Sequence, residues 1–420
     1  MKILLLEFDE KASLVHSDQL SAITSALAQG DYSDLIVVSH GWNNNDDEAK
    51  ALYDNLLNLV SQELPNDKKF IAIGVIWPSK RFGDVQSSVN AASAGPSSSS
   101  LVAQIDALAK ISESDQAAQH LSVLSKQISD KFPAKNISET FSDLFTTLDP
   151  DGSSSRNLNE ENIPQFQPAD ILNMLSDPEL WIDGSSGNGI GGIVATSGTG
   201  GSASLFSQIG EGLQNLLNLT TYYMMKSRSG LIGSQGLNPV LRTLRKDFPE
   251  LKIRIVGHSF GARLVSSAII GGSTADQVEV DSLALLQAAF SHYAFAQSYH
   301  RSLDGLYRAI VDKKLIKGCF FITHSRLDKA VGLAYAVASR MANQVGAKLG
   351  GKDDFYGGLG GNGAQSTPES KQIDLLDVHQ AYAFENDIVY NLKSDQFIMG
   401  HSDICNRQVA HALVAGFKLQ

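Results

Sequence analysis

The sequence predicts an α/β fold in which a doubly wound, mostly parallel sheet is covered by helices. Short apolar runs rich in β-branched residues alternate along the chain with longer segments whose apolar residues recur at helical spacing. This alternation is typical of strand–helix–strand units, which build parallel sheets. The runs are continuously apolar, as expected of strands buried on both faces. With 420 residues, of which 43% are hydrophobic, the chain can bury a large core.

Six apolar runs mark the predicted strands, at 35–38, 70–76, 253–256, 282–286, 319–323 and 387–392. Helical spacing lies between and after these runs, near 51–64, 238–247, 260–270, 302–315, 329–346 and 405–417. The alternation assigns residues 1–84 and 230–420 to one α/β core.

Residues 85–229 break this pattern and form a predicted insertion. Residues 86–100 are rich in Ser, Ala and Gly, and residues 184–204 in Gly and Ser, which is typical of flexible joints. Apolar residues at helical spacing lie between and after the joints, at 101–111, 117–132 and 205–225. We interpret 85–229 as a largely helical insertion, either a mobile lid or a fixed cap that shapes a pocket.

The net charge and the composition limit the classes of partner and compartment that we expect for this protein. The formal net charge of −11 argues against a basic surface for nucleic acid or anionic lipid. No run is long and apolar enough for a membrane span, and the N-terminal run 3–6 is too short for a signal peptide. Two cysteines, Cys319 and Cys405, lack metal-ligand spacing and suit a reducing compartment. We therefore expect a cytoplasmic protein, with export by a non-classical route as the alternative.

The motif Gly257-His258-Ser259-Phe260-Gly261 lies between the predicted strand 253–256 and the predicted helix 260–270. A serine on such a tight, strained turn projects its hydroxyl above the sheet, and side chains in place of the two glycines would clash. The Phe260 amide then lies at a helix start, where it can donate to a developing oxyanion. The alternative is a Gly-Ser turn without chemistry.

The strand–motif–helix arrangement resembles the α/β-hydrolase family, especially its lipases and esterases, over 1–84 and 230–420. The resemblance implies a triad ordered nucleophile, acid, histidine along the chain, each member on a loop after a strand. It implies Ser259 as nucleophile. It implies Asp328 as acid, because Asp328 is the sole carboxylate in the turn 323–328, with a helix cap as the alternative role. The loop 287–295 carries no competing carboxylate.

The same resemblance implies His401 as the base, because it follows the last predicted strand and precedes the last predicted helix. It also implies a second oxyanion donor after Ser39-His40-Gly41, for which the Trp42 amide is the candidate beside that of Phe260. An ordinary capped turn is the alternative there. Trp77, Phe290 and Tyr293 follow strands at this edge and are candidate pocket residues, or ordinary packed aromatics.

We therefore expect a serine hydrolase that cleaves carboxylic esters through an acyl-enzyme, with a small-molecule or lipid-like substrate and no cofactor. A metal cluster of His40, His258 and His324 is disfavoured, since no HxH or HExxH spacing supports it. An amidase or peptidase with the same triad is the nearest alternative. A non-catalytic binding protein on a hydrolase fold is the alternative from another class.

Overall fold

The computed structural model describes residues 1–65, 68–79, 98–110, 112, 114–130, 134–148, 217, 221–222, 224–299, 303–328, 330–331 and 357–418. One sheet has the strand order β1-β3-β2-β4-β5-β6-β8-β7, and every pair of neighbouring strands is parallel. The strands are β1 (Lys2–Glu7), β2 (Asp34–Ser39), β3 (Phe70–Ile76), β4 (Lys252–His258), β5 (Ser282–Leu286), β6 (Phe320–His324), β7 (Ser370–Asp374) and β8 (Val389–Lys393). The predicted α/β class with a mostly parallel sheet is confirmed.

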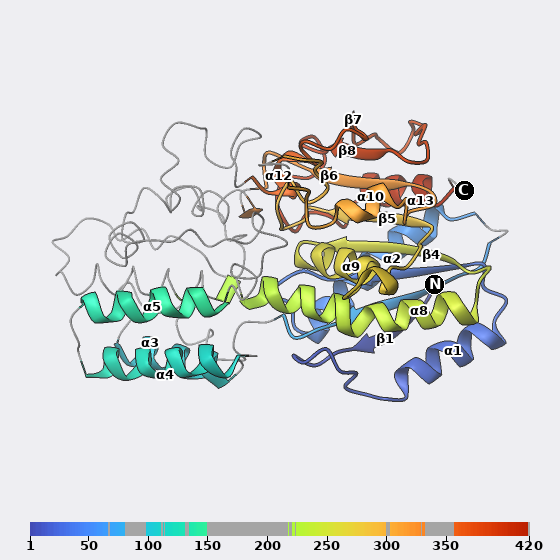
Figure 1. Ribbon diagram of the computed structural model, residues 1–420. Coiled ribbons are helices and arrows are strands. Elements are labelled where there is room, and N and C mark those ends of the chain that lie inside the picture. The colour runs from blue at the N-terminus through green and yellow to red at the C-terminus, as the bar shows by residue number, and fades with distance from the viewer. Residues whose placement is uncertain are drawn as a thin grey trace.

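Helices cover both faces of this sheet (Figure 1). On one face, α2 (Asp46–Glu63) and α13 (Arg407–Lys418) bury one apolar core against the strands. On the other face, α1 (Gln19–Gln29), α8 (Asn238–Asp247) and α9 (Phe260–Ile270) bury a second. The two cores explain why the strands are apolar along their whole length. Shorter helices are η5 (Thr274–Asp276), α10 (Arg308–Asp312) and α12 (Leu359–Asn362).

The six predicted strands are all present, with ends displaced by at most two residues. The predicted helix 302–315 is wrong, because only α10 forms there. Residues before it bond to a neighbouring loop instead of to the next helical turn: the Gly305 amide donates to the Ala296 carbonyl and the Tyr307 amide to the Ala294 carbonyl. The predicted helix 329–346 lies outside the described residues except for helical residues 330 and 331.

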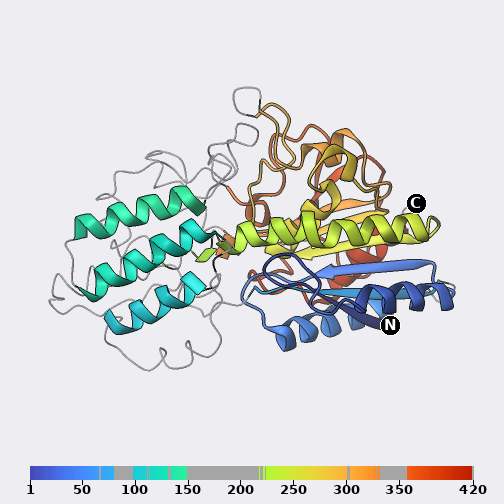
Figure 2. The same ribbon diagram turned by 60° about the horizontal axis from the view of Figure 1, so that its bottom comes forward.

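Three further helices lie to one side of the sheet (Figures 1 and 2). They are α3 (Ser98–Lys110), α4 (Asp115–Ser129) and α5 (Ala134–Leu148), and α4 packs against both others. The first two agree with the helical spacing at 101–111 and 117–132. The predicted joint 184–204 lies outside the described residues, as do most residues of 86–100 and 205–225.

A continuous helical segment leads back from this side to the core (Figure 2). Residues 224–247 are helical throughout, and the π-helical turn η4 (Ile232–Leu237) joins the first part to α8. The segment crosses position 229/230, where we predicted the end of the insertion. No helix among the described residues has the length and apolar character needed to cross a bilayer.

Candidate active site

Ser259 lies alone between the end of β4 and the start of α9, and its backbone is strained. Its φ of 57° and ψ of −123° fall outside the regions that non-glycine residues prefer. A Cβ on Gly257 would lie 2.5 Å from Ala262 Cα, and one on Gly261 would lie 2.3 Å from the His40 carbonyl oxygen. Glycine is therefore required on both sides of the turn, as the motif predicted.

Two hydrogen bonds connect Ser259 to the two other predicted triad residues. His401 Nε2 lies 2.8 Å from Ser259 Oγ, and His401 Nδ1 lies 2.9 Å from Asp328 Oδ2. An Nδ1–H that donates to the carboxylate leaves Nε2 free to accept the serine proton. All three side chains are buried, with exposed fractions of 2%, 2% and 8% for Ser259, Asp328 and His401.

The parallel sheet brings these three residues together. Ser259 follows β4, Asp328 follows β6 after a short turn, and His401 lies beyond β8. Because the strands are parallel, their carboxyl ends lie at one edge, and loops far apart in the chain meet there. The Ser259–His401 bond spans 142 residues and the His401–Asp328 bond spans 73.

Asp328 has two further hydrogen-bond donors. The Val331 amide lies 3.0 Å from Asp328 Oδ1, so the carboxylate also caps the helical residues that follow it. Gln287 Nε2 lies 3.0 Å from Asp328 Oδ2, the oxygen that faces His401. The cap and triad alternatives are thus combined in one side chain. Gln287 was missed because no local pattern in the loop 287–295 distinguishes it from an ordinary polar residue.

His258, the residue before Ser259, supports the loop of His401. Its Nε2–H donates to the His401 carbonyl oxygen at 2.9 Å, and the two imidazole rings lie 5.1 Å apart. Burial, reinforced by repulsion from His401, lowers the pKa of His258 to about 3. The ring is therefore neutral at neutral pH and adds no positive charge beside His401.

The loop after β2 lies against Ser259. A Cβ on Gly41 would lie 2.6 Å from Ser259 Cβ, so only glycine permits this approach. Neither the Trp42 nor the Phe260 backbone N–H has an acceptor among the described residues. Their side chains are buried together, with ring centroids 6.0 Å apart, and Tyr222 packs against both. Both predicted oxyanion amides thus belong to the residues that directly follow Gly41 and Ser259, the two residues in close contact.

No protein-family model, curated protein or solved structure matches this chain.

Trp77 packs against His40 under the loop after β2. The rings stack with centroids 5.4 Å apart, and Trp77 Nε1–H donates to the His40 carbonyl at 3.1 Å. Burial lowers the pKa of His40 to about 4, so this imidazole is neutral as well. These contacts make Trp77 a support for the loop that carries Gly41 and Trp42.

The other two predicted pocket residues lie in aromatic clusters. Phe290 is fully buried, and its ring centroid lies 5.4 Å from that of Tyr307. Tyr293 stacks on Tyr299 with centroids 4.6 Å apart. For Phe290 this is the ordinary core packing that we considered as the alternative. Among the described residues, no three His, Cys, Asp or Glu side chains are grouped to hold a metal ion.

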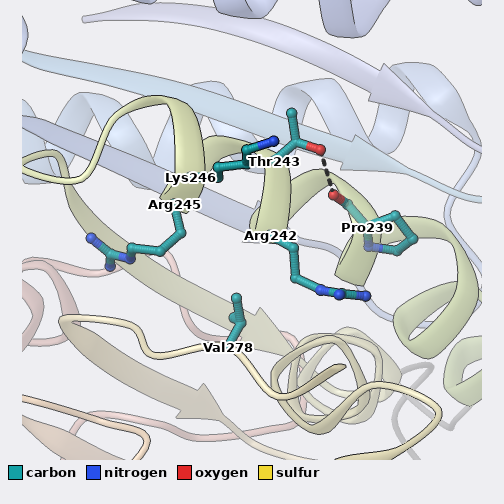
Figure 3. A pocket seen from close by; sticks show the side chains of 6 residues that line it. All are labelled: Pro239, Arg242, Thr243, Arg245, Lys246 and Val278. Carbon is teal, nitrogen blue, oxygen red and sulfur yellow. Dashed lines mark hydrogen bonds between the residues drawn. The ribbon is translucent and has the colours of Figure 1, made fainter. Parts of the chain in front are cut away.

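A surface hollow of about 560 Å³ is lined mostly by residues of α8 (Figure 3). Its lining includes Val278, which precedes β5 and so lies towards the amino end of that strand, opposite to Ser259. Arg242 and Arg245 are paired with Asp276 and Asp281. These arginines are therefore already neutralised, and the hollow is not part of the candidate active site. The lining residues are Pro239, Arg242, Thr243, Arg245, Lys246 and Val278.

Proposed function

We propose that this protein is a serine hydrolase of the α/β-hydrolase type that cleaves carboxylic esters through an acyl-enzyme. One observation carries the proposal: the hydrogen-bonded series Ser259–His401–Asp328, with its serine on a strained turn between a strand and a helix. A nucleophile bonded to a base that is itself oriented by a carboxylate is the arrangement that nucleophilic catalysis requires.

The geometry supports a two-step reaction. Ser259 Oγ attacks the ester carbonyl carbon while His401 Nε2 accepts the hydroxyl proton. The amides of Phe260 and Trp42 stabilise the tetrahedral oxyanion, and Asp328 stabilises the imidazolium. His401 then donates its proton to the leaving alcohol, and the acyl group remains on Ser259. Water, activated by His401, attacks the acyl-enzyme and releases the acid.

The proposed substrate class rests on the predicted insertion. The helices α3–α5 lie to one side of the sheet, and residues 85–229 remain our candidate for a lid or fixed cap over an ester with an apolar acyl chain. The same triad chemistry serves amides, so substrate choice is an outcome of the experiment below.

The proposal is tested by covalent labelling with a fluorophosphonate probe, followed by hydrolysis of p-nitrophenyl esters of increasing chain length and of a matched anilide. We expect labelling and ester hydrolysis, and both should disappear in Ser259→Ala, with kcat reduced about 10⁶-fold. Ser402→Ala removes an exposed serine next to His401 and should label like the wild type. Absence of labelling in the folded wild type would contradict the proposal. Faster cleavage of the anilide than of the ester would replace esterase by amidase.

A further inference from the structure

Gln287, at the end of β5, has an unusual backbone for its residue type. The side chain is fully buried, yet the residue has a φ of 45°, in the left-handed region that favours glycine. Such strain is concentrated at functional sites, where the surrounding structure holds it in place. The residue follows the strand next to that of Ser259 and is one of the buried polar groups at this edge.

The side-chain amide of Gln287 has one possible orientation. Its Nε2 lies 3.0 Å from Asp328 Oδ2 and 3.2 Å from the Gly360 carbonyl oxygen. An ionised carboxylate and a carbonyl only accept hydrogen bonds, so the NH₂ group must face both of them. The Gly360 carbonyl is itself held in place, because it also accepts from the Ser325 amide at 2.9 Å.

Gln287 therefore completes the set of donors around Asp328. Oδ1 accepts from the Val331 amide, while Oδ2 accepts from both His401 Nδ1–H and Gln287 Nε2–H. A buried carboxylate that accepts from several donors is fixed in direction. Without Gln287, His401 would be the sole side-chain donor to Oδ2 among the described residues, and the carboxylate could rotate away from the imidazole.

We propose that Gln287 is a positioning residue of the triad, whose side-chain amide keeps Asp328 directed at His401. This inference rests on the proposed function. It gives the loop after β5 a role in the same reaction, although that loop carries no carboxylate.

The test uses the full chain and the substitution Gln287→Glu, which keeps the shape of the side chain. In its protonated form the introduced carboxyl group can donate its O–H to Asp328 Oδ2 as the amide does, whereas its ionised form would repel that carboxylate. Two carboxylates that share a site have one strongly raised pKa. We therefore expect fluorophosphonate labelling within about threefold of wild type near pH 7. At alkaline pH the rate should fall at least about tenfold, a decrease that the wild type lacks.

Two further variants keep the test decisive. Gln287→Met lacks the donor at every pH, and its kcat should fall roughly 10- to 100-fold with KM unchanged, less than the about 10⁴-fold expected for loss of the acid. Gln365→Glu is the matched control, because the Gln365 amide donates to the Asn362 and Gly363 carbonyls and to no carboxylate among the described residues. It should show no alkaline decrease. A Gln287→Glu profile parallel to that of wild type, or wild-type kcat in Gln287→Met, would overturn the inference.

A measurement independent of turnover separates this inference from the proposed function. The low-field proton resonance of His401 Nδ1–H reports its bond to Asp328, and it should shift or broaden in folded Gln287→Met but not in Gln365→Glu. An unchanged resonance in Gln287→Met would overturn the role of Gln287 even if the wild type is labelled. If the wild type is not labelled but the resonance shifts in Gln287→Met, the hydrolase proposal is rejected, and the effect of Gln287 on the bond between Asp328 and His401 is retained.

Discussion

The Ser259 hydroxyl is hydrogen-bonded to His401 Nε2, and the tautomer of that ring depends on what faces Nδ1. Asp328 Oδ2 faces it at 2.9 Å. Among the described residues, every partner of this carboxylate is a donor: the Val331 amide, the Gln287 amide and His401. A group in position 328 must therefore accept on both sides, and a carboxylate is the side chain of this size that does so.

Asp328→Asn should reduce the labelling rate and kcat by about 10⁴-fold with little change in stability. If the oxygen of the introduced amide accepts from the Val331 amide, its NH₂ group faces Gln287 Nε2–H and His401 Nδ1. His401 must then shift its proton to Nε2, which can no longer accept from Ser259. The measurement is the pH dependence of labelling at matched folded fraction. Retention of most activity would reassign the acid, with Asp403 the next candidate.

At the scale of elements, α12 packs against the turn that carries Gln287. A Cβ on Gly360 would lie 2.6 Å from the carbonyl carbon of Gln287, whereas a Cβ on the adjacent Gly361 would meet nothing within 4 Å. The Gly360 amide also donates to the Ala288 carbonyl at 2.8 Å. The short helix is thus fixed against the strained turn that follows β5.

Gly360→Ala should therefore separate α12 from Gln287, lower the melting temperature by several degrees and reduce the labelling rate. Gly361→Ala is its matched control and should be neutral in both measurements. Thermal unfolding followed by circular dichroism, combined with labelling, compares the two variants. If the two alanine variants had the same melting temperature and labelling rate, the close approach of Gly360 would have no effect on stability or activity.

Elements also show where sequence prediction succeeds. Strands buried on both faces are visible as apolar runs, so β2 to β6 and β8 were predicted. The edge strand β7 was not, because its polar sequence SKQID is mostly solvent-exposed and has no apolar run. The run 3–6, which we considered only as a signal peptide, forms most of β1.

The candidate site was predictable to the extent that it depends on order along the chain. Ser259, Asp328 and His401 follow β4, β6 and β8, and a parallel sheet places such loops at one edge. Gln287 and His258 act through contacts across 41 and 143 residues, which no local pattern encodes. Phe290 was proposed for the pocket because a buried core aromatic and a pocket aromatic look the same in sequence.

At the scale of the whole molecule, three buried histidines among the described residues have lowered pKa values and so connect stability to pH. Burial lowers the pKa of His40 to about 4, that of His258 to about 3 and that of His324 to about 4, against 6.5 in the unfolded chain. Below pH 6.5 the unfolded chain binds protons that the folded state does not. The stabilisation is therefore fully present above pH 6.5 and is lost as the pH falls towards the folded-state values.

We expect the free energy of unfolding in urea to fall between about pH 6.5 and 5, by up to about 1.4 kcal/mol per histidine per pH unit. Most carboxylates titrate below this window, so the histidines dominate it. His324→Gln removes one of these groups without touching His401 and should reduce the slope. Stability that does not change over this window, or an unchanged slope in His324→Gln, would contradict this account.

The separations along the sequence between Ser259, Asp328 and His401 also affect when the candidate site forms during synthesis. Because Ser259 precedes His401 by 142 residues, a ribosome-bound chain has made Ser259 long before His401. The strained turn at Ser259 also needs Leu286, whose carbonyl accepts from the Ser259 amide at 3.1 Å. This turn therefore forms only after β5 has been added. On the proposed assignment the serine is inert throughout elongation and becomes reactive when β8 pairs with β6. The onset of Ser259 labelling by a phosphonate probe would then report when the sheet is complete.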